Sequence, residues 1–218
     1  MGVIWCLHGF LGRGGDWDFL RDAGFEVRAP SLFSGDSLDD LRPSPNDILL
    51  GYSMGARLAL RLISQWGAGA LAGAVLVSAG LTYPEPGRRE LDETWARRFE
   101  SEPWDSVVAA WNAQPVFGGR QNPLVRSEAD FDRSALAKAL RDWSPAVLHS
   151  SLRDIAVPTL WIAGEHDSKY VEAARRAAER LPNAELWICP DSAHRVPWEQ
   201  PQRFIERLRN FVSPALPR

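Results

Sequence analysis

Three short segments of the sequence contain the residue types of a site that moves protons or forms covalent intermediates. They read GYSMG around Ser53, GEHDSKY around Asp167 and DSAHRVPWEQP around His194. An imidazole takes and returns a proton near neutral pH, while a carboxylate fixes its tautomer and stabilises its cation. Together the three side chains would activate the serine hydroxyl.

The GYSMG segment follows an apolar run and begins an amphipathic one, which predicts a strand, a tight turn and a helix. In this G-x-S-x-G pattern the turn strains Ser53, and the flanking glycines let strand and helix approach closely. The hydroxyl would then be exposed at the head of the helix. The same pattern also fits a tight strand–helix connection in which Ser53 only caps the helix.

Asp167 and His194 each follow an expected strand, so both fall on loops at the same end of a parallel sheet as Ser53. Alternatively, Asp167 is a helix N-cap and His194 is a surface-loop histidine. Asp191 is a rival for the acid, although Asp167 has the better position. The other histidines are not expected to do chemistry; they are His8, which we interpret as structural, and His149 and His166, which we expect near the surface.

The elements that must position these residues alternate along the chain. The expected strands cover residues 3–7, 25–29, 47–50, 74–78, 159–163 and 185–189. The expected helices cover residues 16–22, 54–66, 171–180 and 202–211. Alternation with strands that are apolar on both faces predicts the α/β class, with a mostly parallel central sheet and helices on both faces. We expect residues 1–218 to form one domain.

The alternation is interrupted from about residue 81 to about residue 153. This region contains helical patterns at residues 88–99, 104–114 and 134–143, and no convincing strand. An insertion between two strands of a parallel sheet would lie over the carboxyl ends of the strands, where such sheets bind ligands. We therefore predict a helical lid.

Composition argues against several classes of partner. A net charge of −3 gives no general field for holding nucleic acid or an anionic membrane. No stretch has the length of a membrane span, and the N-terminus lacks the positive region of a signal peptide, so we expect a cytoplasmic protein. Cys6 and Cys189 fall in apolar runs and imply neither a disulfide framework nor a metal site. No pattern indicates an oligomeric state.

Two further features surround the serine. The segment LHGFLG at residues 7–12 follows the first expected strand, so the backbone N–H groups of Phe10 and Met54 form a candidate oxyanion hole. Arg57 lies four residues after Ser53, on the same face of the expected helix. A positive charge at that place suits an anionic substrate.

The segments LHGFLG, GYSMG, GEHDSKY and DSAHRVPWEQP resemble the α/β-hydrolase superfamily over nearly the whole chain. The string RRELDETWARRFESEPWDSVVAAWNAQPVF at residues 88–117 resembles one branch, the 2-succinyl-6-hydroxy-2,4-cyclohexadiene-1-carboxylate synthases of the menaquinone pathway. This resemblance implies elimination of pyruvate from 2-succinyl-5-enolpyruvyl-6-hydroxy-3-cyclohexene-1-carboxylate, with no cofactor and no metal. It further implies that residues matching the family's binding positions line the substrate pocket; these are Arg57, Arg88, Arg126, Tyr52 and Trp111.

The implied chemistry fits these residue types. The substrate carries several carboxylates and a ketone, and the proton to be removed is α to that ketone, so arginines and an oxyanion hole are both needed. Ser53 would then act as a base. Two alternatives stay open: a carboxylesterase or thioesterase in which Ser53 forms an acyl-enzyme, and a non-catalytic protein that keeps only the ligand pocket.

The sequence departs from that branch in three places. Asn112 follows the lid tryptophan, where an aromatic residue is usual, and we expect it to alter the wall around the substrate. The segment APSLFSGDS at residues 29–37 lacks the PGHG loop common in relatives. The first motif strand comes almost at the start of the sequence, so we expect a fold without the usual N-terminal hairpin. None of these departures touches Ser53, Asp167 or His194.

Overall fold

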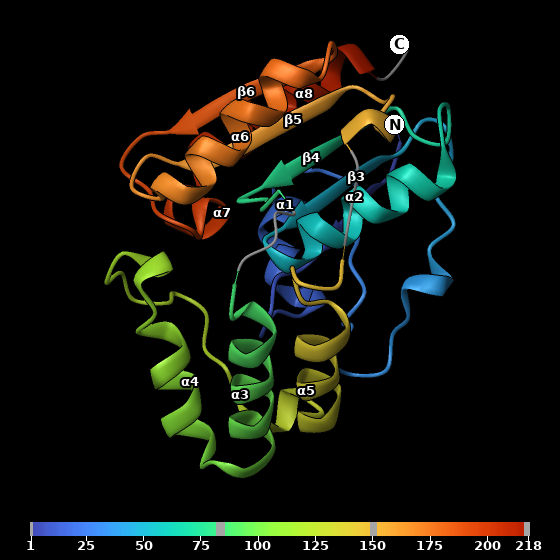
Figure 1. Ribbon diagram of the computed structural model, residues 1–218. Helices are drawn as coiled ribbons and strands as arrows, with labels where there is room; N and C mark the ends of the chain where they lie inside the picture. The colour runs from blue at the N-terminus through green and yellow to red at the C-terminus, as the bar shows by residue number, and fades with distance from the viewer. Residues whose placement is uncertain (1, 82–85, 149–151, 216–218) are drawn as a thin grey trace.

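The computed structural model describes residues 2–81, 86–148 and 152–215, and its centre is a six-stranded parallel sheet (Figure 1). The strands are β1 (Ile4–Leu7), β2 (Val27–Arg28), β3 (Ile48–Tyr52), β4 (Gly73–Val77), β5 (Thr159–Gly164) and β6 (Ala184–Cys189). Their order across the sheet is β2-β1-β3-β4-β5-β6, and every neighbouring pair is parallel. The predicted α/β class is confirmed.

Side chains of each strand alternate between two apolar layers, as the period of two residues in a strand requires. On β3, Leu49 packs into one cluster, whereas Ile48 and Leu50 pack into the other. The first cluster contains apolar residues of α2 (Met54–Trp66) and α6 (Ser168–Arg180). The second contains residues of η1 (Gly14–Trp17), α1 (Asp18–Asp22) and α8 (Pro201–Ala215). Helices therefore cover both faces and leave the carboxyl ends of the strands for other contacts.

Two expected elements near the N-terminus are shorter than predicted. The expected strand 25–29 is only Val27–Arg28, because the Phe25 N–H turns back to the Leu20 carbonyl. The expected helix 16–22 is α-helical only from Asp18. It is preceded by the 3-10 turn η1, where the Asp16 carboxylate accepts the Arg13 N–H. Local hydrogen bonds thus set both starting points.

The region between β4 and β5 is helical, as predicted. It contains α3 (Arg88–Ser101), α4 (Trp104–Asn112) and α5 (Arg133–Asp142), with the short turns η3 (Pro115–Phe117) and η4 (Glu128–Asp130). Figure 1 shows α3, α4 and α5 grouped together at one side of the sheet. The remaining short elements are η2 (Leu38–Asp40), η5 (Leu152–Asp154) and α7 (Val196–Glu199). Among the described residues, no helix has the length and apolar character needed to cross a membrane.

Candidate active site

Ser53 occupies a strained turn between β3 and α2. Its φ of 53° and ψ of −109° lie in a region that residues with a Cβ rarely adopt. A Cβ on Gly51 would lie 2.5 Å from the Gly55 carbonyl oxygen, and one on Gly55 would lie 2.2 Å from the Leu7 carbonyl oxygen. The predicted steric role of both glycines is therefore confirmed.

Ser53, His194 and Asp167 form one chain of hydrogen bonds. The Ser53 Oγ lies 2.9 Å from His194 Nε2, and His194 Nδ1 lies 2.6 Å from Asp167 Oδ2. A carboxylate only accepts, so Nδ1–H donates to Asp167 and Nε2 is left to accept the serine proton. Asp167 and His194 are 4% and 3% exposed. The arrangement can therefore withdraw a proton from the serine hydroxyl through an imidazole and a carboxylate that are shielded from bulk water.

The capping alternatives do not agree with this geometry. Ser53 and Asp167 do precede α2 and α6 as N-caps, but neither side chain makes a capping hydrogen bond. Both side chains are directed to His194 instead. The rival acid Asp191 has a side chain that is 75% exposed and pairs with Arg120. The position of Asp191 thus agrees with the prediction that Asp167 is the better placed of the two acids.

The loop that carries His194 is held closely against the end of β5. A Cβ on Gly164 would lie 2.0 Å from the Ala193 carbonyl oxygen, so this contact requires glycine. The Ser78 hydroxyl donates to the His194 carbonyl oxygen at 2.9 Å. Tyr170 packs edge-on to the His194 ring, with ring centroids 4.6 Å apart. These contacts fix the imidazole between its two partners.

His8 has the structural position expected for it. It is fully buried; its Nδ1 donates to the Gly9 carbonyl oxygen at 2.8 Å, and its Nε2 accepts the Leu32 N–H at 3.0 Å. Burial lowers the pKa of His8 to about 4, because the imidazolium would lose its hydration. The His166 side chain is 51% exposed, as expected, and His149 lies outside the described residues.

The two residues expected to form an oxyanion hole, Phe10 and Met54, line the same cavity as Ser53. Met54 is the first residue of α2, so its N–H has no acceptor within the helix and points along the positive end of the helix dipole. Phe10 and Met54 both line the larger cavity next to Ser53. The oxyanion hole formed by their N–H groups stays a prediction.

Ser53 lies between two cavities of different size. The larger one has a volume of about 390 Å³ and is lined by Arg57, Arg88 and Tyr170. The smaller one has a volume of about 40 Å³ and is lined by Tyr52, Arg126 and Arg195. Five residues line both cavities: Phe10, Ser53, Trp111, Phe117 and His194. The helical region thus contributes Trp111 and Phe117 to the walls around the serine.

Two of the arginines predicted to bind substrate line the larger cavity, and they differ in their hydrogen bonds and ion pairs. Arg88 forms a bidentate pair with Asp92, at 2.8 Å and 2.7 Å. Arg57 donates to the Trp143 carbonyl oxygen at 3.2 Å, while its buried Nε has no hydrogen-bond partner in the part of the chain that the structure describes. Burial lowers the pKa of Arg57, because the guanidinium is deprived of water. Arg57 is therefore the one of this pair with unused hydrogen-bonding capacity.

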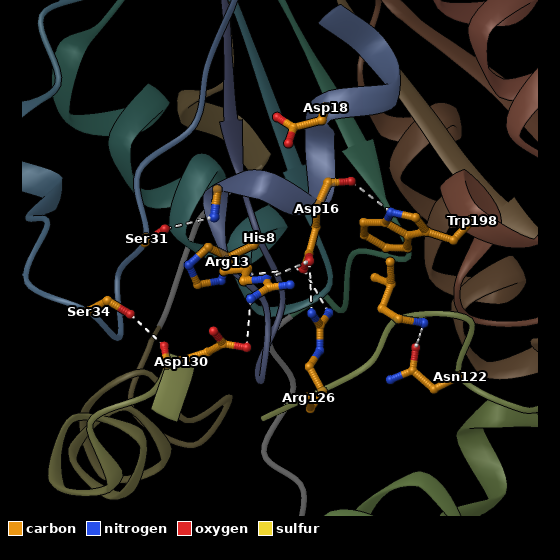
Figure 2. Close-up of polar contacts among 12 residues, drawn as sticks. His8, Arg13, Asp16, Asp18, Ser31, Ser34, Asn122, Arg126, Asp130 and Trp198 are labelled. Carbon is orange, nitrogen blue, oxygen red and sulfur yellow. Dashed lines mark hydrogen bonds and ion pairs between the residues drawn. The ribbon is translucent and has the colours of Figure 1, made fainter. Parts of the chain in front are cut away.

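Arg126 lines the smaller cavity and pairs there with a residue that is far away in sequence. Figure 2 shows its guanidinium directed at Asp16, with bonds of 2.8 Å and 2.7 Å. Both side chains are almost completely buried, and Trp198 donates to the Asp16 carbonyl oxygen beside them. The pair joins the loop before η4 to the turn at η1. Arg126 thus lines the site with both terminal nitrogens already engaged.

The sequence interpretation missed Arg195 and Asp16. Arg195 follows His194 directly and lines the smaller cavity, where its Nη1 is buried and has no hydrogen-bond partner among residues 2–81, 86–148 and 152–215. The signal available in the sequence was a charged residue directly after the expected catalytic histidine. Asp16 offered no comparable signal, because its partner is 110 positions away. Among the described residues, no cluster of histidine, cysteine and acidic side chains is arranged to hold a metal ion.

Residues 6–207 match the model of a known family, described as the alpha/beta hydrolase family. The chain belongs to the alpha/beta hydrolase family. This α/β hydrolase is 30% identical to the 2-succinyl-6-hydroxy-2,4-cyclohexadiene-1-carboxylate synthase of Serratia proteamaculans (strain 568), over 96% of the chain and 92% of that relative. It is 32% identical to the synthase of the same name from Enterobacter sp. (strain 638), over 89% and 85%. The predicted resemblance to this branch is confirmed.

Solved structures share the fold of this α/β hydrolase. MenH from S. aureus has a TM-score of 0.83 at 24% identity, and the match covers 98% of the chain and 94% of that structure. A thermophilic esterase from Thermogutta terrifontis has a TM-score of 0.77 at 19% identity, with coverage of 100% and 91%. At such identities the likeness supports the fold alone. The reaction must be argued from the site.

Proposed function

We propose that this α/β hydrolase is a 2-succinyl-6-hydroxy-2,4-cyclohexadiene-1-carboxylate synthase. Its reaction eliminates pyruvate from 2-succinyl-5-enolpyruvyl-6-hydroxy-3-cyclohexene-1-carboxylate in menaquinone synthesis. The relatives of this name, similar over most of their length, support the branch. The hydrogen-bonded Ser53, His194 and Asp167 beside Arg57 support the chemistry.

In the proposed mechanism the three residues act as a base. The Ser53 hydroxyl gives its proton to His194 Nε2, and the resulting alkoxide removes the proton α to the substrate ketone. The negative charge moves to the ketone oxygen, where the N–H groups of Phe10 and Met54 stabilise it. Collapse of this enolate shifts the ring double bond and breaks the ring carbon–oxygen bond. Pyruvate leaves as its enolate and takes up the proton that His194 holds, which returns the three residues to their starting state.

Arginines supply the binding of an anionic substrate. Arg57 lines the larger cavity with an unpartnered Nε and no ion pair among the described residues, so a substrate carboxylate can bind to it. Arg88 lines the same cavity together with Asp92, and this bidentate pair adds no net charge to it. Arg126, held by Asp16, serves the smaller cavity. Tyr52 and Trp111 form the pocket walls.

The helical region between β4 and β5 acts as a lid in this proposal. Trp111 on α4 and Phe117 on η3 line both cavities and belong to this region. The Trp111 ring packs against Phe10 with centroids 4.5 Å apart, which brings the region onto the loop of the proposed oxyanion hole. Exclusion of water there would strengthen each charged contact with the substrate.

The observation that carries the proposal is the position of Arg57. Its guanidinium lines the same cavity as the activated serine and makes no ion pair among the described residues. A buried cation of this kind is costly unless a ligand supplies the counter-charge. An esterase acting on neutral esters has no use for such a charge, whereas a substrate with several carboxylates does.

Pyruvate release tests the proposed function. The unstable enolpyruvyl cyclohexene substrate is generated in situ by the enzyme that precedes this step, and lactate dehydrogenase reports pyruvate. Because the substrate also decomposes spontaneously, wild type is compared with Ser53→Ala at equal concentration. Fast release in wild type that falls to background in the variant supports the lyase.

The same pair of proteins separates the alternatives. If wild type does not exceed background, the lyase reaction is wrong, and a panel of 4-nitrophenyl esters and acyl thioesters is tested next. Turnover of these esters that needs Ser53 would indicate acyl transfer. An unchanged biological role in a host that carries Ser53→Ala would instead indicate a ligand-binding protein.

A further inference from the structure

Two guanidinium groups near the serine make no ion pair among the described residues. Arg57 lines the larger cavity, and Arg195 lines the smaller one. Arg195 is only 5% exposed, and its buried Nη1 has no hydrogen-bond partner within the described part of the chain. Burial lowers the pKa of Arg195, because the guanidinium loses its hydration inside the protein. This buried donor is not used by the triad or by the proposed oxyanion hole.

Neighbouring side chains hold the Arg195 guanidinium in one place. It stacks on the Phe117 ring, with Cζ 3.6 Å from the ring centroid, and its Nη2 donates to the Asn112 side-chain oxygen. The Asn122 amide donates to the same oxygen at 3.3 Å. The guanidinium is thus oriented by an aromatic face and a neutral amide. A neutral partner leaves the positive charge uncompensated.

The arginine and aspartate side chains that line the smaller cavity, Asp16, Arg126 and Arg195, sum to one positive charge. The Arg126 and Asp16 side chains form a bidentate pair and cancel each other. Glu199 lies outside the lining; its carboxylate accepts the backbone N–H groups of Ala193 and Arg195, and it shares the Arg120 guanidinium with Asp191, at 3.5 Å and 2.9 Å respectively. Among the described side chains that line the cavity, Arg195 alone is a cation without an ion-pair partner. One monoanionic group in the cavity would compensate it.

The size of the cavity matches the same kind of group. Its volume of about 40 Å³ is room for about three water-sized atoms, since one such atom needs roughly 10–15 Å³. A carboxylate consists of one carbon and two oxygens, whereas a six-membered ring needs a larger space such as the neighbouring cavity. Ser53 lines both spaces. A molecule that enters the larger cavity can therefore extend a carboxylate past the serine.

We propose that Arg195 is a specificity-determining residue, which binds one carboxylate of the substrate in the smaller cavity while Arg57 binds another in the larger one. The inference deepens the proposed function and rests on it, because it concerns the same substrate class. The site then selects molecules with two anionic groups on either side of the reacting carbon.

A stable probe makes the test independent of turnover. The probe is 2-(3-carboxypropanoyl)benzoate, a dicarboxylate with the carbon skeleton of the proposed product. Two monocarboxylates each lack one of its charges: 2-butanoylbenzoate and 4-oxo-4-phenylbutanoate. Calorimetry gives Kd of all three probes for wild type and for Arg195→Met, which keeps an unbranched apolar side chain. We expect Arg195→Met to weaken the dicarboxylate about tenfold or more.

The monocarboxylates distinguish binding from structural support. Arg195→Met should not weaken binding of the monocarboxylate that lacks the group bound by Arg195. It should weaken binding of the other monocarboxylate, which keeps that group. Asn112→Asp is a second variant; it supplies an internal carboxylate to the same guanidinium and should weaken the dicarboxylate although Arg195 is present. Arg207→Met is the control, because Arg207 pairs with Glu185 outside both cavities.

Several outcomes would overturn the inference. They are no binding of the dicarboxylate to wild type, an equal loss for all three probes in Arg195→Met, or full affinity in both variants. The pyruvate assay separates this failure from failure of the proposed function. Charge-specific loss of binding without pyruvate release would reject the reaction and keep the anion site, whereas pyruvate release without that loss would do the reverse.

Discussion

Arg126 and Asp16, 110 positions apart in sequence, form a bidentate ion pair inside the protein (Figure 2). The pair joins the segment that follows α4 to the turn before α1. Next to it, Arg13 makes a second contact between the same two segments, with Asp130 at 2.6 Å. The second pair is much more exposed, so the two pairs form a matched comparison of buried and surface charge.

Breaking the buried pair should destabilise the protein far more than breaking the exposed one. Asp16→Asn leaves the Arg126 guanidinium buried without its counter-charge, and we expect the free energy of unfolding to fall by about 3–5 kcal/mol. Asp130→Asn should cost less than about 1 kcal/mol. Urea unfolding at pH 7 measures both variants. Equal losses of unfolding free energy would show that burial does not increase the contribution of the Asp16–Arg126 pair to stability.

Glycine in place of Ser53, the proposed base, should give a more stable fold than alanine at the same position, and both substitutions should remove activity. The φ of 53° at Ser53 strains any side chain with a Cβ. Ser53→Gly should therefore exceed Ser53→Ala in free energy of unfolding by about 1 kcal/mol, after the extra chain entropy of glycine is subtracted. Calorimetric melting of the two variants measures the difference. A less stable glycine variant would contradict the strain.

A methyl group at Gly51 should disrupt the turn that carries the serine. The new Cβ would lie 2.5 Å from the Gly55 carbonyl oxygen and 2.7 Å from the Ala56 nitrogen, and both are backbone atoms that cannot rotate away. We expect Gly51→Ala to cost about 3 kcal/mol of stability. The control is Gly15→Ala, whose Cβ would meet only the Asp18 side chain, at 3.6 Å. Similar melting temperatures for both variants would refute this explanation.

Removing Arg57 should weaken turnover and leave the fold intact. Its side chain makes one hydrogen bond to the residues that the structure describes, to the Trp143 carbonyl oxygen, and it contributes little to the core. Loss of a charged contact with a substrate carboxylate should lower kcat/KM roughly 10- to 100-fold in Arg57→Ala. Arg61→Ala, one turn further along α2 at an exposed position, is the control. Unchanged kinetics in Arg57→Ala would remove the main argument for an anionic substrate.

His8 should make stability fall at moderately acidic pH. Its pKa in the folded protein is about 4, below the ordinary value of 6.5, so between these pH values the unfolded chain binds more protons. The stabilisation is therefore complete above pH 6.5 and is lost as pH falls toward 4, by about 3 kcal/mol in total. Urea unfolding of wild type and His8→Gln across this range measures the effect. Identical slopes would assign the pH dependence to other groups.

Local patterns in the sequence predicted much of the fold. The bounds of α2 agree with its pattern, because an apolar stripe begins directly after Ser53 and ends before Gly67. Ser53, His194 and Asp167 were predictable as a group, since each follows a strand of a parallel sheet and such strands end at one edge. Cys6 and Cys189 are buried, as their apolar neighbours indicated.

Features that depend on distant contacts were not predictable in the same way. The Asp16 carboxylate is surrounded by ordinary polar residues in sequence, and only folding brings Arg126 to it. Arg195 stood beside the expected histidine, yet its importance arises from the neutral Asn112 amide and the Phe117 ring, which lie on other elements. Hydrogen bonds around Phe25 shortened the second strand, although its propensity favoured more residues.

The helical region between β4 and β5 also governs how the chain folds. In the sheet register, Ala74 pairs with Thr159, so two adjacent strands are 85 positions apart in sequence. Closing a loop of that length costs little free energy in the end, because the entropy grows only with the logarithm of length. The cost is kinetic: contacts between distant residues slow folding and prolong the exposure of unpaired strands. The segment that supplies walls to the site therefore also delays completion of the sheet.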